Sequence, residues 1–265
     1  MAARPVRPRA NDLMNLLSGF ADISLAQLLL VAAVALLASV IGGVSGYGSG
    51  ALMPLVLVPM IGAAPVVPII AISAMFNNFG RVTAFYKYAD WPRVWRAGLF
   101  ALPTCALGAW GYTFLSGKGA ALVIGAMLIL SVPLRRLLKH HEVKIGNRGL
   151  CVGAVGYGLV VGGTAGSGVI MLSLLMAAGL EGAAVVATDA AVSIIVSTVK
   201  ISVFALGGVV TAQVLAFALL IGVIAFPGAW LARLFVERMP VHVHTAILDF
   251  IVLLGGVMMI VAAFR

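Results

Sequence analysis

Charge is what this sequence lacks most. Only 9% of its 265 residues are charged and 63% are hydrophobic, whereas about a quarter of the residues of a soluble domain are charged. No charged residue occurs between Asp22 and Arg81, or between Lys200 and Arg233. Because about 20 apolar residues span a bilayer, each run can hold more than one membrane segment. The composition excludes an ordinary soluble domain and predicts an all-α integral membrane protein.

Cysteine is also scarce, which narrows the possible chemistry. Cys105 and Cys151 both lie in apolar segments, where a cysteine usually behaves as a small buried hydrophobe. Their spacing is not typical of a metal site or of a disulfide framework. We therefore expect no metal, no cofactor and no disulfide.

Apolar length, prolines and charged residues divide the chain into eight predicted membrane spans. They cover residues 23–43, 65–88, 93–115, 119–138, 149–163, 182–206, 210–232 and 243–264. Two further apolar pieces, 51–61 and 169–178, are too short to cross a bilayer of about 30 Å at about 1.5 Å per helical residue. We predict that these pieces form short re-entrant half-helices.

A glycine-rich turn precedes each short piece, and the two turns occupy matching places in the chain. They are residues 42–50 (GGVSGYGSG) and 162–168 (GGTAGSG). Each glycine weakens a helix by about 1 kcal/mol relative to alanine, so this density favours a break. The alternative is close helix packing, for which glycines four residues apart are typical. Irregular backbone at membrane depth must be buried in protein or line a cavity. Two breaks in matching places therefore predict a polar site between two halves, the layout of a transporter.

The chain divides into an N-terminal segment (1–22), a first repeat (23–138), a basic linker (139–148) and a second repeat (149–265). The cluster around the linker contains Arg135, Arg136, Lys139, Lys144 and Arg148. Such a cluster indicates the cytoplasmic side of a membrane. With four spans per half, both termini are expected on that side too, and the repeats share one orientation about an axis along the membrane normal. If the short pieces also cross the bilayer, the repeats are inverted instead.

In these features the sequence resembles the TauE/SafE sulfite exporter family over residues 25–264. The resemblance rests on residues 42–50 followed by Pro54, on the pair Asp90-Trp91, on the basic linker and on residues 162–168. It implies a bacterial permease with two related halves, which moves small sulfur-containing or organic anions such as sulfite, sulfonates and sulfoacetate, mostly outward. The glycine turns depart from the consecutive glycines of the family, so the exact anion is not carried over.

Arg81 and Lys200 are the most informative charges. Each lies near the end of the span that follows a glycine turn, so the two residues are near-equivalents in the two repeats. A cation at the centre of a membrane helix costs about 2.5–3.5 kcal/mol, and such residues usually mark a functional site. Two converging cations predict a site for an anion. The alternative is that both side chains extend to the membrane interface.

Amide and hydroxyl groups accompany both cations. Asn77 and Asn78 lie one turn before the arginine, and Ser193 and Ser197 occupy similar places before the lysine. Residues three and four apart share a helix face, and these groups can donate hydrogen bonds to the oxygens of a sulfonate or sulfite. Hydrogen bonds between neighbouring helices are the alternative role, especially for the serines.

The turns themselves can contribute to a substrate site. Their hydroxyl side chains are Ser45, Tyr47, Ser49, Thr164 and Ser167. Backbone amides and the positive ends of the half-helix dipoles would also favour an anion.

Asp189 lies in the same predicted span as Lys200. We expect it to pair with Arg81 across the repeat interface; capping of a glycine turn and transport of a coupled proton are the alternatives. Export needs no coupled ion, because a negative charge that leaves a negative cytoplasm gains about 2.3 kcal/mol per 100 mV.

Two other functions compete with that of a transporter. Residues 43–46 (GVSG) match the pattern around the nucleophile of intramembrane serine proteases, which would use Ser45. A serine nucleophile needs a base, and the histidines at 140, 141, 242 and 244 lie near predicted span ends. We therefore expect no enzyme. An anion channel is the second alternative, and the sequence leaves oligomerisation open.

Overall fold

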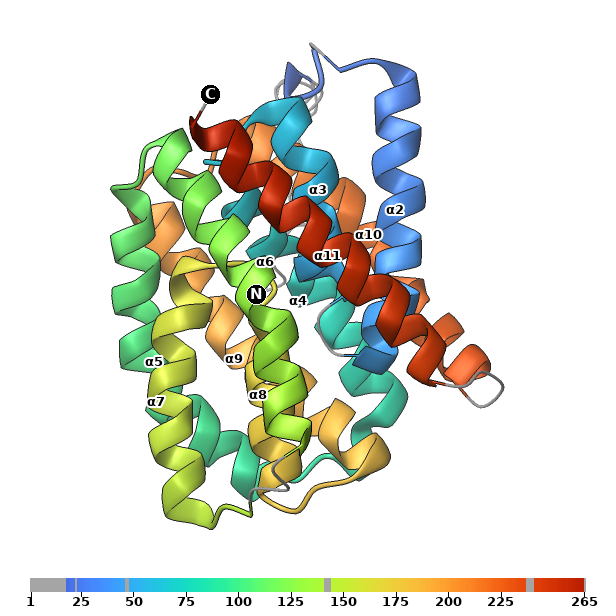
Figure 1. Ribbon diagram of the computed structural model, residues 1–265, viewed down its shortest axis with the longest axis vertical. Coiled ribbons are helices and arrows are strands. Elements are labelled where there is room, and N and C mark those ends of the chain that lie inside the picture. The colour runs from blue at the N-terminus through green and yellow to red at the C-terminus, as the bar shows by residue number, and fades with distance from the viewer. Residues whose placement is uncertain (1–17, 22, 46–47, 141–143, 237–240, 265) are drawn as a thin grey trace, which may run out of the picture.

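The helices run mainly along the long axis of the molecule (Figure 1). The computed structural model describes residues 18–21, 23–45, 48–140, 144–236 and 241–264. Within these ranges the chain forms ten α-helices, one 3-10 helix and no strand. The first part comprises α2 (Leu25–Ser45), α3 (Gly48–Ile61), α4 (Val66–Phe85), η1 (Tyr86–Tyr88), α5 (Trp91–Thr113) and α6 (Gly117–His140). The second comprises α7 (Asn147–Gly163), α8 (Gly168–Ala177), α9 (Gly182–Leu206), α10 (Ala212–Val236) and α11 (Val241–Phe264).

Each predicted span and half-helix coincides with one of these helices. The span predicted at 182–206 is α9, and the two short pieces are α3 and α8. In the described part of the chain, three stretches are long and apolar enough to cross a membrane: Leu25–Gly42, Val66–Tyr88 and Gly182–Leu206. The fold is thus all-helical and membrane-like, and the number of helices that cross the bilayer stays a prediction.

The two short helices end in the same way. Gly62 follows α3 with a φ of 79°, and Gly179 lies just beyond α8 with a φ of 87°. Their amides donate to the carbonyls of Val58 and Met176 at 3.0 and 2.9 Å. Because glycine adopts this left-handed conformation without steric strain, it commonly ends a helix. The lengths of both short helices are therefore encoded locally.

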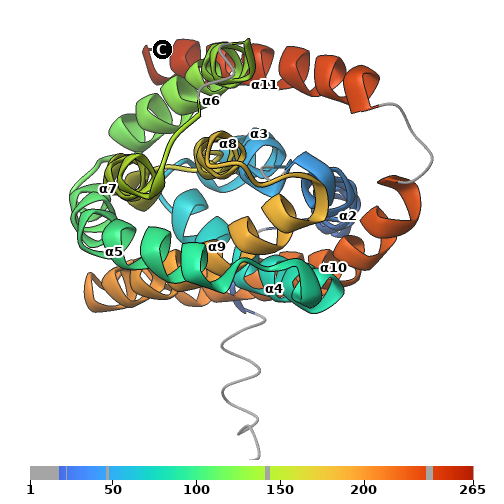
Figure 2. The ribbon, with the colours of Figure 1, turned by 90° about the horizontal axis from the view of Figure 1, so that it is seen from below.

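Two apolar cores hold the helices together, and each core mixes the two halves of the sequence. One contains Cys105 of α5, Tyr157 of α7, Leu175 of α8 and Val192 of α9. The other is built mainly from α2, α3, α4, α6, α10 and α11. Helix α5 packs against α7 and α9, whereas α10 packs against α2 and α4. Helix α5 of the first half thus packs with helices of the second half, and α10 of the second half packs with helices of the first. We call the group α5, α7, α8 and α9 one bundle and the group α2, α3, α4 and α10 the other bundle. Viewed along the long axis, α3 and α8 lie inside the surrounding helices (Figure 2).

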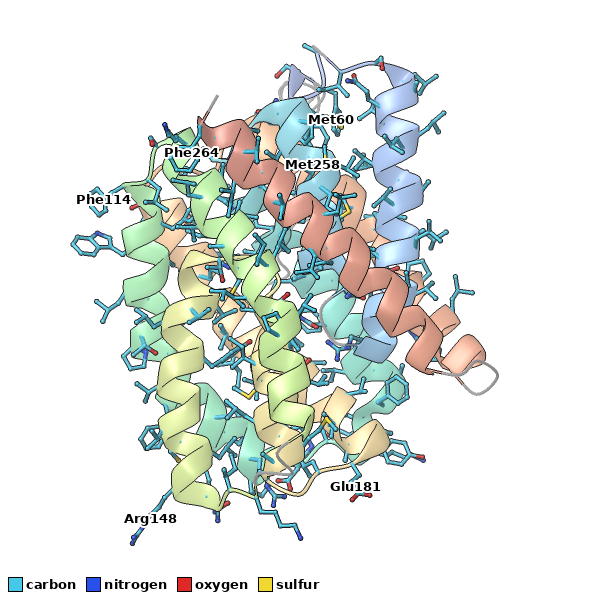
Figure 3. All side chains as sticks on the ribbon, in the orientation of Figure 1. Met60, Phe114, Arg148, Glu181, Met258 and Phe264 are labelled. Atoms are coloured by element: carbon cyan, nitrogen blue, oxygen red, sulfur yellow. The ribbon has the colours of Figure 1, made fainter. Side chains whose placement is uncertain are left out.

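The two halves run in opposite directions, which corrects the expected shared orientation. Met60 near the end of α3 lies at one end of the molecule, and Glu181 just after α8 lies at the other (Figure 3). Phe264 near the C-terminus and Arg148 at the end of the linker likewise lie at opposite ends. In the described part of the chain, Phe264 and the linker residue Arg148 thus do not share one side, contrary to the expectation for the C-terminus, while the side of the N-terminus stays a prediction. The physical reason is that the described part of each half has five α-helices, because each short helix reverses the chain once more.

Close packing of α5 on α7 depends on glycine, which gives a first prediction. A Cβ atom on Gly158 would lie 2.3 Å from the carbonyl oxygen of Ala101 and 2.3 Å from Oγ1 of Thr104. Gly158→Ala must push the helices apart, so we expect it to destabilise the protein by about 1–3 kcal/mol. This should appear as a lower melting temperature of the purified protein in detergent.

Gly156→Ala is the matched control on the same helix, because a Cβ atom there meets nothing within 4 Å. Alanine favours a helix over glycine by about 1 kcal/mol, so this variant should melt at the wild-type temperature or above it. Equal melting temperatures for the two variants would contradict the packing argument.

Candidate functional site

A cavity of about 90 Å³ lies between α4, α7, α8 and α9. It exceeds the roughly 10–15 Å³ that one water molecule needs. Both glycine-rich regions contribute to its wall, through Gly42 and Gly50 of the first and residues 164–168 of the second. The polar side chains on the wall are Asn77, Asn78, Arg81, Tyr157, Thr164, Ser167, Ser193, Ser197 and Lys200.

The two glycine regions touch each other beside this cavity. A Cβ atom on Gly50 would lie 2.7 Å from the backbone nitrogen of Gly166, so only glycine allows this approach. Gly166 itself has a φ of 81°, a conformation that glycine adopts most readily. Helix α7 ends at Gly163 and α8 begins at Gly168, so the predicted break in the second half is present. The amino end of α8 faces the cavity through Ser167 and Gly168, and this is the positive end of the helix dipole.

Arg81 is buried and already has a counter-ion. Its Nη2 atom lies 3.0 Å from Oδ2 of Asp189, and Nη1 donates to Oδ1 of Asn78 at 3.1 Å. Nη2 also lies 3.4 Å from the carbonyl oxygen of Val186. The exposed fractions of the arginine and aspartate side chains are 2% and 1%. The expected pairing of Arg81 with Asp189 is therefore present, and it joins α4 of one bundle to α9 of the other.

Lys200 is equally buried but is held differently. Its Nζ atom donates to the carbonyl oxygens of Val161 at 2.6 Å and Thr164 at 2.8 Å, and lies 5.9 Å from the centre of the Phe204 ring. These carbonyls lie in the last turn of α7 and just beyond it, where a cation is favourable. Among the described side chains, the ion pairs found are Arg81–Asp189 and Arg93–Asp90. Lys200 thus has dipoles around it but no carboxylate within pairing distance in that set.

Helices α4 and α9 present corresponding positions to the cavity. When the sequence of α4 is aligned with that of α9 without gaps, Arg81 corresponds to Lys200 and Asn78 corresponds to Ser197. Asn77 corresponds to Val196 and Ala74 to Ser193 in the same alignment, and all eight residues line the cavity. The backbone arrangement of the two helices is therefore alike, while their side-chain chemistry differs.

The structure brings most of the sequence-predicted site residues together. Eight of them line the cavity: Asn77, Asn78, Arg81, Thr164, Ser167, Ser193, Ser197 and Lys200. The Thr164 hydroxyl donates to the carbonyl of Val160 at 2.7 Å, so it also caps α7. Asp189 pairs with Arg81 but is not part of the wall. For Ser45 and Ser49 the structure describes only the backbone, and Tyr47 lies outside the described residues.

Tyr157 is a cavity residue that the sequence interpretation missed. Its side chain comes from α7 and is 2% exposed. It lies between Gly156 and Gly158 in an otherwise small and apolar segment. A buried tyrosine hydroxyl normally needs a polar partner. A single tyrosine in this small and apolar segment could therefore have indicated a polar site.

Several buried polar atoms beside the cavity lack a protein partner. Within the described part of the chain, Oδ1 of Asn77, Nε of Arg81 and Oδ1 of Asp189 make no hydrogen bond. Buried polar groups are normally satisfied by protein, water or a ligand. Of these atoms only Nε of Arg81 can donate to an anion, whereas the two oxygens accept and suit a water molecule or a guest that carries a donor.

The Asp90-Trp91 pair belongs to a second polar cluster, which closes the end nearest the linker. Oδ1 of Asp90 accepts from the backbone amide of Arg93 at 3.0 Å and so caps α5. The Asp90 amide donates to Oγ1 of Thr188 at 3.0 Å. Arg93 pairs with Asp90 and donates to the carbonyl of Ala178 at 3.0 Å. This cluster ties the beginning of α5 to the end of α8 and to α9.

Comparison with known protein families shows that a family model covers most of the chain. Residues 31–259 match the family model described as Sulfite exporter TauE/SafE. No curated protein and no solved structure matches the chain. The match spans both glycine regions, both buried cations and the whole cavity wall.

The buried ion pair yields a second prediction. Removal of one partner leaves an uncompensated charge in the interior, so Arg81→Gln and Asp189→Asn should each destabilise the protein by about 3–5 kcal/mol. The double variant carries no uncompensated charge at this position and should recover more than half of that loss. Melting temperatures of the four proteins in detergent measure the coupling.

Asp90→Asn serves as the control, because this aspartate also pairs with an arginine but is 24% exposed. Exposed pairs contribute about 0–1 kcal/mol, and asparagine can still cap α5. If the double variant at positions 81 and 189 loses as much stability as the two single variants together, the predicted coupling is contradicted.

Proposed function

The chain belongs to the sulfite exporter TauE/SafE family, whose members are membrane transporters, and from this premise we propose that its cavity binds small anions during transport. The cargo is a small sulfur-containing or organic anion, such as sulfite, a sulfonate or sulfoacetate. It moves outward across the bacterial inner membrane, because a leaving negative charge gains about 2.3 kcal/mol per 100 mV.

One observation carries the proposal: Lys200 is a buried cation on the cavity wall and has no carboxylate partner among the described side chains. An uncompensated charge in a low-dielectric interior is costly. An anion in the cavity would provide the missing negative charge. The hypothesis of two converging cations, suggested by the sequence, is thereby refined, since Arg81 already shares its charge with Asp189.

The remaining wall residues would orient the anion. Asn77 and Asn78 supply amides, Ser193 and Ser197 supply hydroxyls, and Tyr157 supplies a phenol. These groups can donate to sulfonate or carboxylate oxygens, and bonds to a charged acceptor are the stronger ones.

The beginning of α8 would contribute as well. Ser167 and Gly168 bring the amino end of α8 to the cavity, and the helix dipole favours negative charge there. By their corresponding place in the first half, Ser45, Tyr47 and Ser49 would have the equivalent role beside α3.

Alternating access would use the inverted arrangement. Transporters with inverted repeats commonly bind substrate at the interface of broken helices and move one body against the other around that site. Here we take residues 23–138 and 149–265 as the two repeats. The moving bodies are then the two bundles, since α5 and α10 are exchanged between the halves.

The distribution of basic residues orients the molecule. Lys87, Arg93 and Arg96 flank the connection from α4 to α5, at the end where Arg148 lies (Figure 3). The basic linker between α6 and α7 is at the same end, and we assign this end to the cytoplasm. The start of α2 and the end of α11 then face the periplasm.

Replacement of Lys200 tests the substrate site. We expect Lys200→Gln to lower kcat/KM at least about tenfold, because a charge-assisted hydrogen bond contributes roughly 1.5–3 kcal/mol. The measurement is counterflow of labelled sulfite, sulfoacetate and oxalate in proteoliposomes. Lys200→Arg keeps the charge and should retain part of the activity.

Lys118→Gln is the matched control, because this lysine is exposed and outside the cavity. It should transport like the wild type. Normal counterflow in a folded Lys200→Gln protein would contradict the assignment, and unsaturable ohmic currents would point to a channel instead.

Cysteine labelling tests the orientation. In a background where Cys105 and Cys151 are replaced by alanine, single cysteines are placed at the exposed positions Lys118 and Arg148. In spheroplasts, a membrane-impermeant maleimide should label position 118 directly and position 148 only after permeabilisation. The reverse pattern would overturn the assigned orientation, and labelling of both positions from one side would contradict a membrane-crossing α6 (Gly117–His140).

A further inference from the structure

Resting on the proposed function, we infer that Asp189 sets the valence of the anion that the cavity accepts, so that among the proposed cargoes monoanions such as simple sulfonates bind in preference to dianions such as sulfoacetate. Among the described side chains, the buried carboxylates, lysines and arginines beside the cavity are Arg81, Asp189 and Lys200, with exposed fractions of 2%, 0% and 5%. Two positive charges and one negative charge leave a net charge of one positive unit. A bound monoanion brings that sum to zero.

The position of Asp189 is what makes this possible. Its Oδ2 atom lies 3.0 Å from Nη2 of Arg81, yet the residue is not part of the cavity wall. It therefore lowers the positive charge of the site without presenting a carboxylate to the guest. A carboxylate on the wall would instead repel an anion by direct contact.

A dianion would leave one negative charge uncompensated in the interior. Burial of an unpaired charge in a low-dielectric medium is strongly unfavourable. The hydroxyl and amide groups of the wall supply hydrogen bonds to either guest, so they contribute little to the choice between valences. The difference between the two guests is then controlled mainly by the third charge, that of Asp189.

The two halves support this assignment by their asymmetry. Arg81 and Lys200 occupy corresponding positions of α4 and α9. In the same alignment the counterpart of Asp189 in α4 is Ile70, an apolar residue. The site thus contains one carboxylate for two cations. If the two halves had the same side chains at these positions, the site would contain either no carboxylate or two.

The test compares the binding of methanesulfonate, a monoanion, with that of sulfate, a dianion of similar size. Calorimetric titration of the full chain in detergent should show that the wild type prefers methanesulfonate. Asp189→Asn should shift the affinity ratio toward sulfate by about tenfold or more, because one negative charge is removed at short range. Asparagine keeps an oxygen that can accept a hydrogen bond from Arg81. Sulfate should also raise the melting temperature of this variant more than that of the wild type.

Two control proteins separate charge from position. Asp90→Asn is the same substitution at a partly exposed ion pair outside the cavity, and it should keep the wild-type ratio. The double variant Arg81→Gln with Asp189→Asn has the wild-type net charge and should also keep the preference for methanesulfonate. A sulfate preference in the double variant would overturn the role of net charge.

The outcomes distinguish this inference from the proposed function. A folded Asp189→Asn protein with an unchanged ratio overturns the inference alone. A wild type that binds sulfate as tightly as methanesulfonate overturns it as well, whether or not the variants fold. If the wild type binds neither anion and Lys200→Gln transports normally, both the inference and the proposed function fail.

Discussion

The structure depends on one constraint: a positive charge inside an apolar protein must be compensated where it lies. Lys200 and Arg81 satisfy this constraint in two different ways. The lysine donates to two carbonyls at the end of α7, whose own helical partners are missing because the helix stops there. The arginine uses a carboxylate and an asparagine oxygen. The break in the second half and its buried cation therefore depend on each other, since the break frees the carbonyls that hold the lysine.

The glycine regions meet a second constraint, which is steric. Gly50 and Gly166 approach so closely that a single methyl group at Gly50 would clash with backbone. Two chain breaks can meet beside one cavity only when neither carries a side chain at the crossing point. The composition of both regions thus follows from the crossing as well as from the helix breaks. The two explanations that the sequence left open, a true break and close packing, apply together in the second half.

Much of the fold was predictable because its signals are local. Apolar length, proline and glycine define helix ends, and the predicted span at 182–206 agrees with α9 residue for residue. Helical spacing placed Asn77, Asn78 and Arg81 on one face, and all three line the cavity. The direction of the second half was predicted wrongly, because it depends on how many times the chain reverses. The pairing of Arg81 with Asp189 was expected, but the two carbonyls that hold Lys200 were missed, since they depend on which groups lie nearby in space. The roles of these residues stay proposals.

On the proposed function, the Arg81–Asp189 pair would link binding to movement. It bridges α4 and α9, and these helices belong to different bundles. Loss of one partner from a buried pair costs about 3–5 kcal/mol, so the empty protein resists any separation of α4 from α9 at this point. On the proposed mechanism, an anion beside Arg81 would offer its guanidinium another acceptor and would lower that resistance. On the proposed mechanism, the same charges would therefore select the cargo and restrain the bundles, and a change in the valence of the site would also change the ease with which it opens.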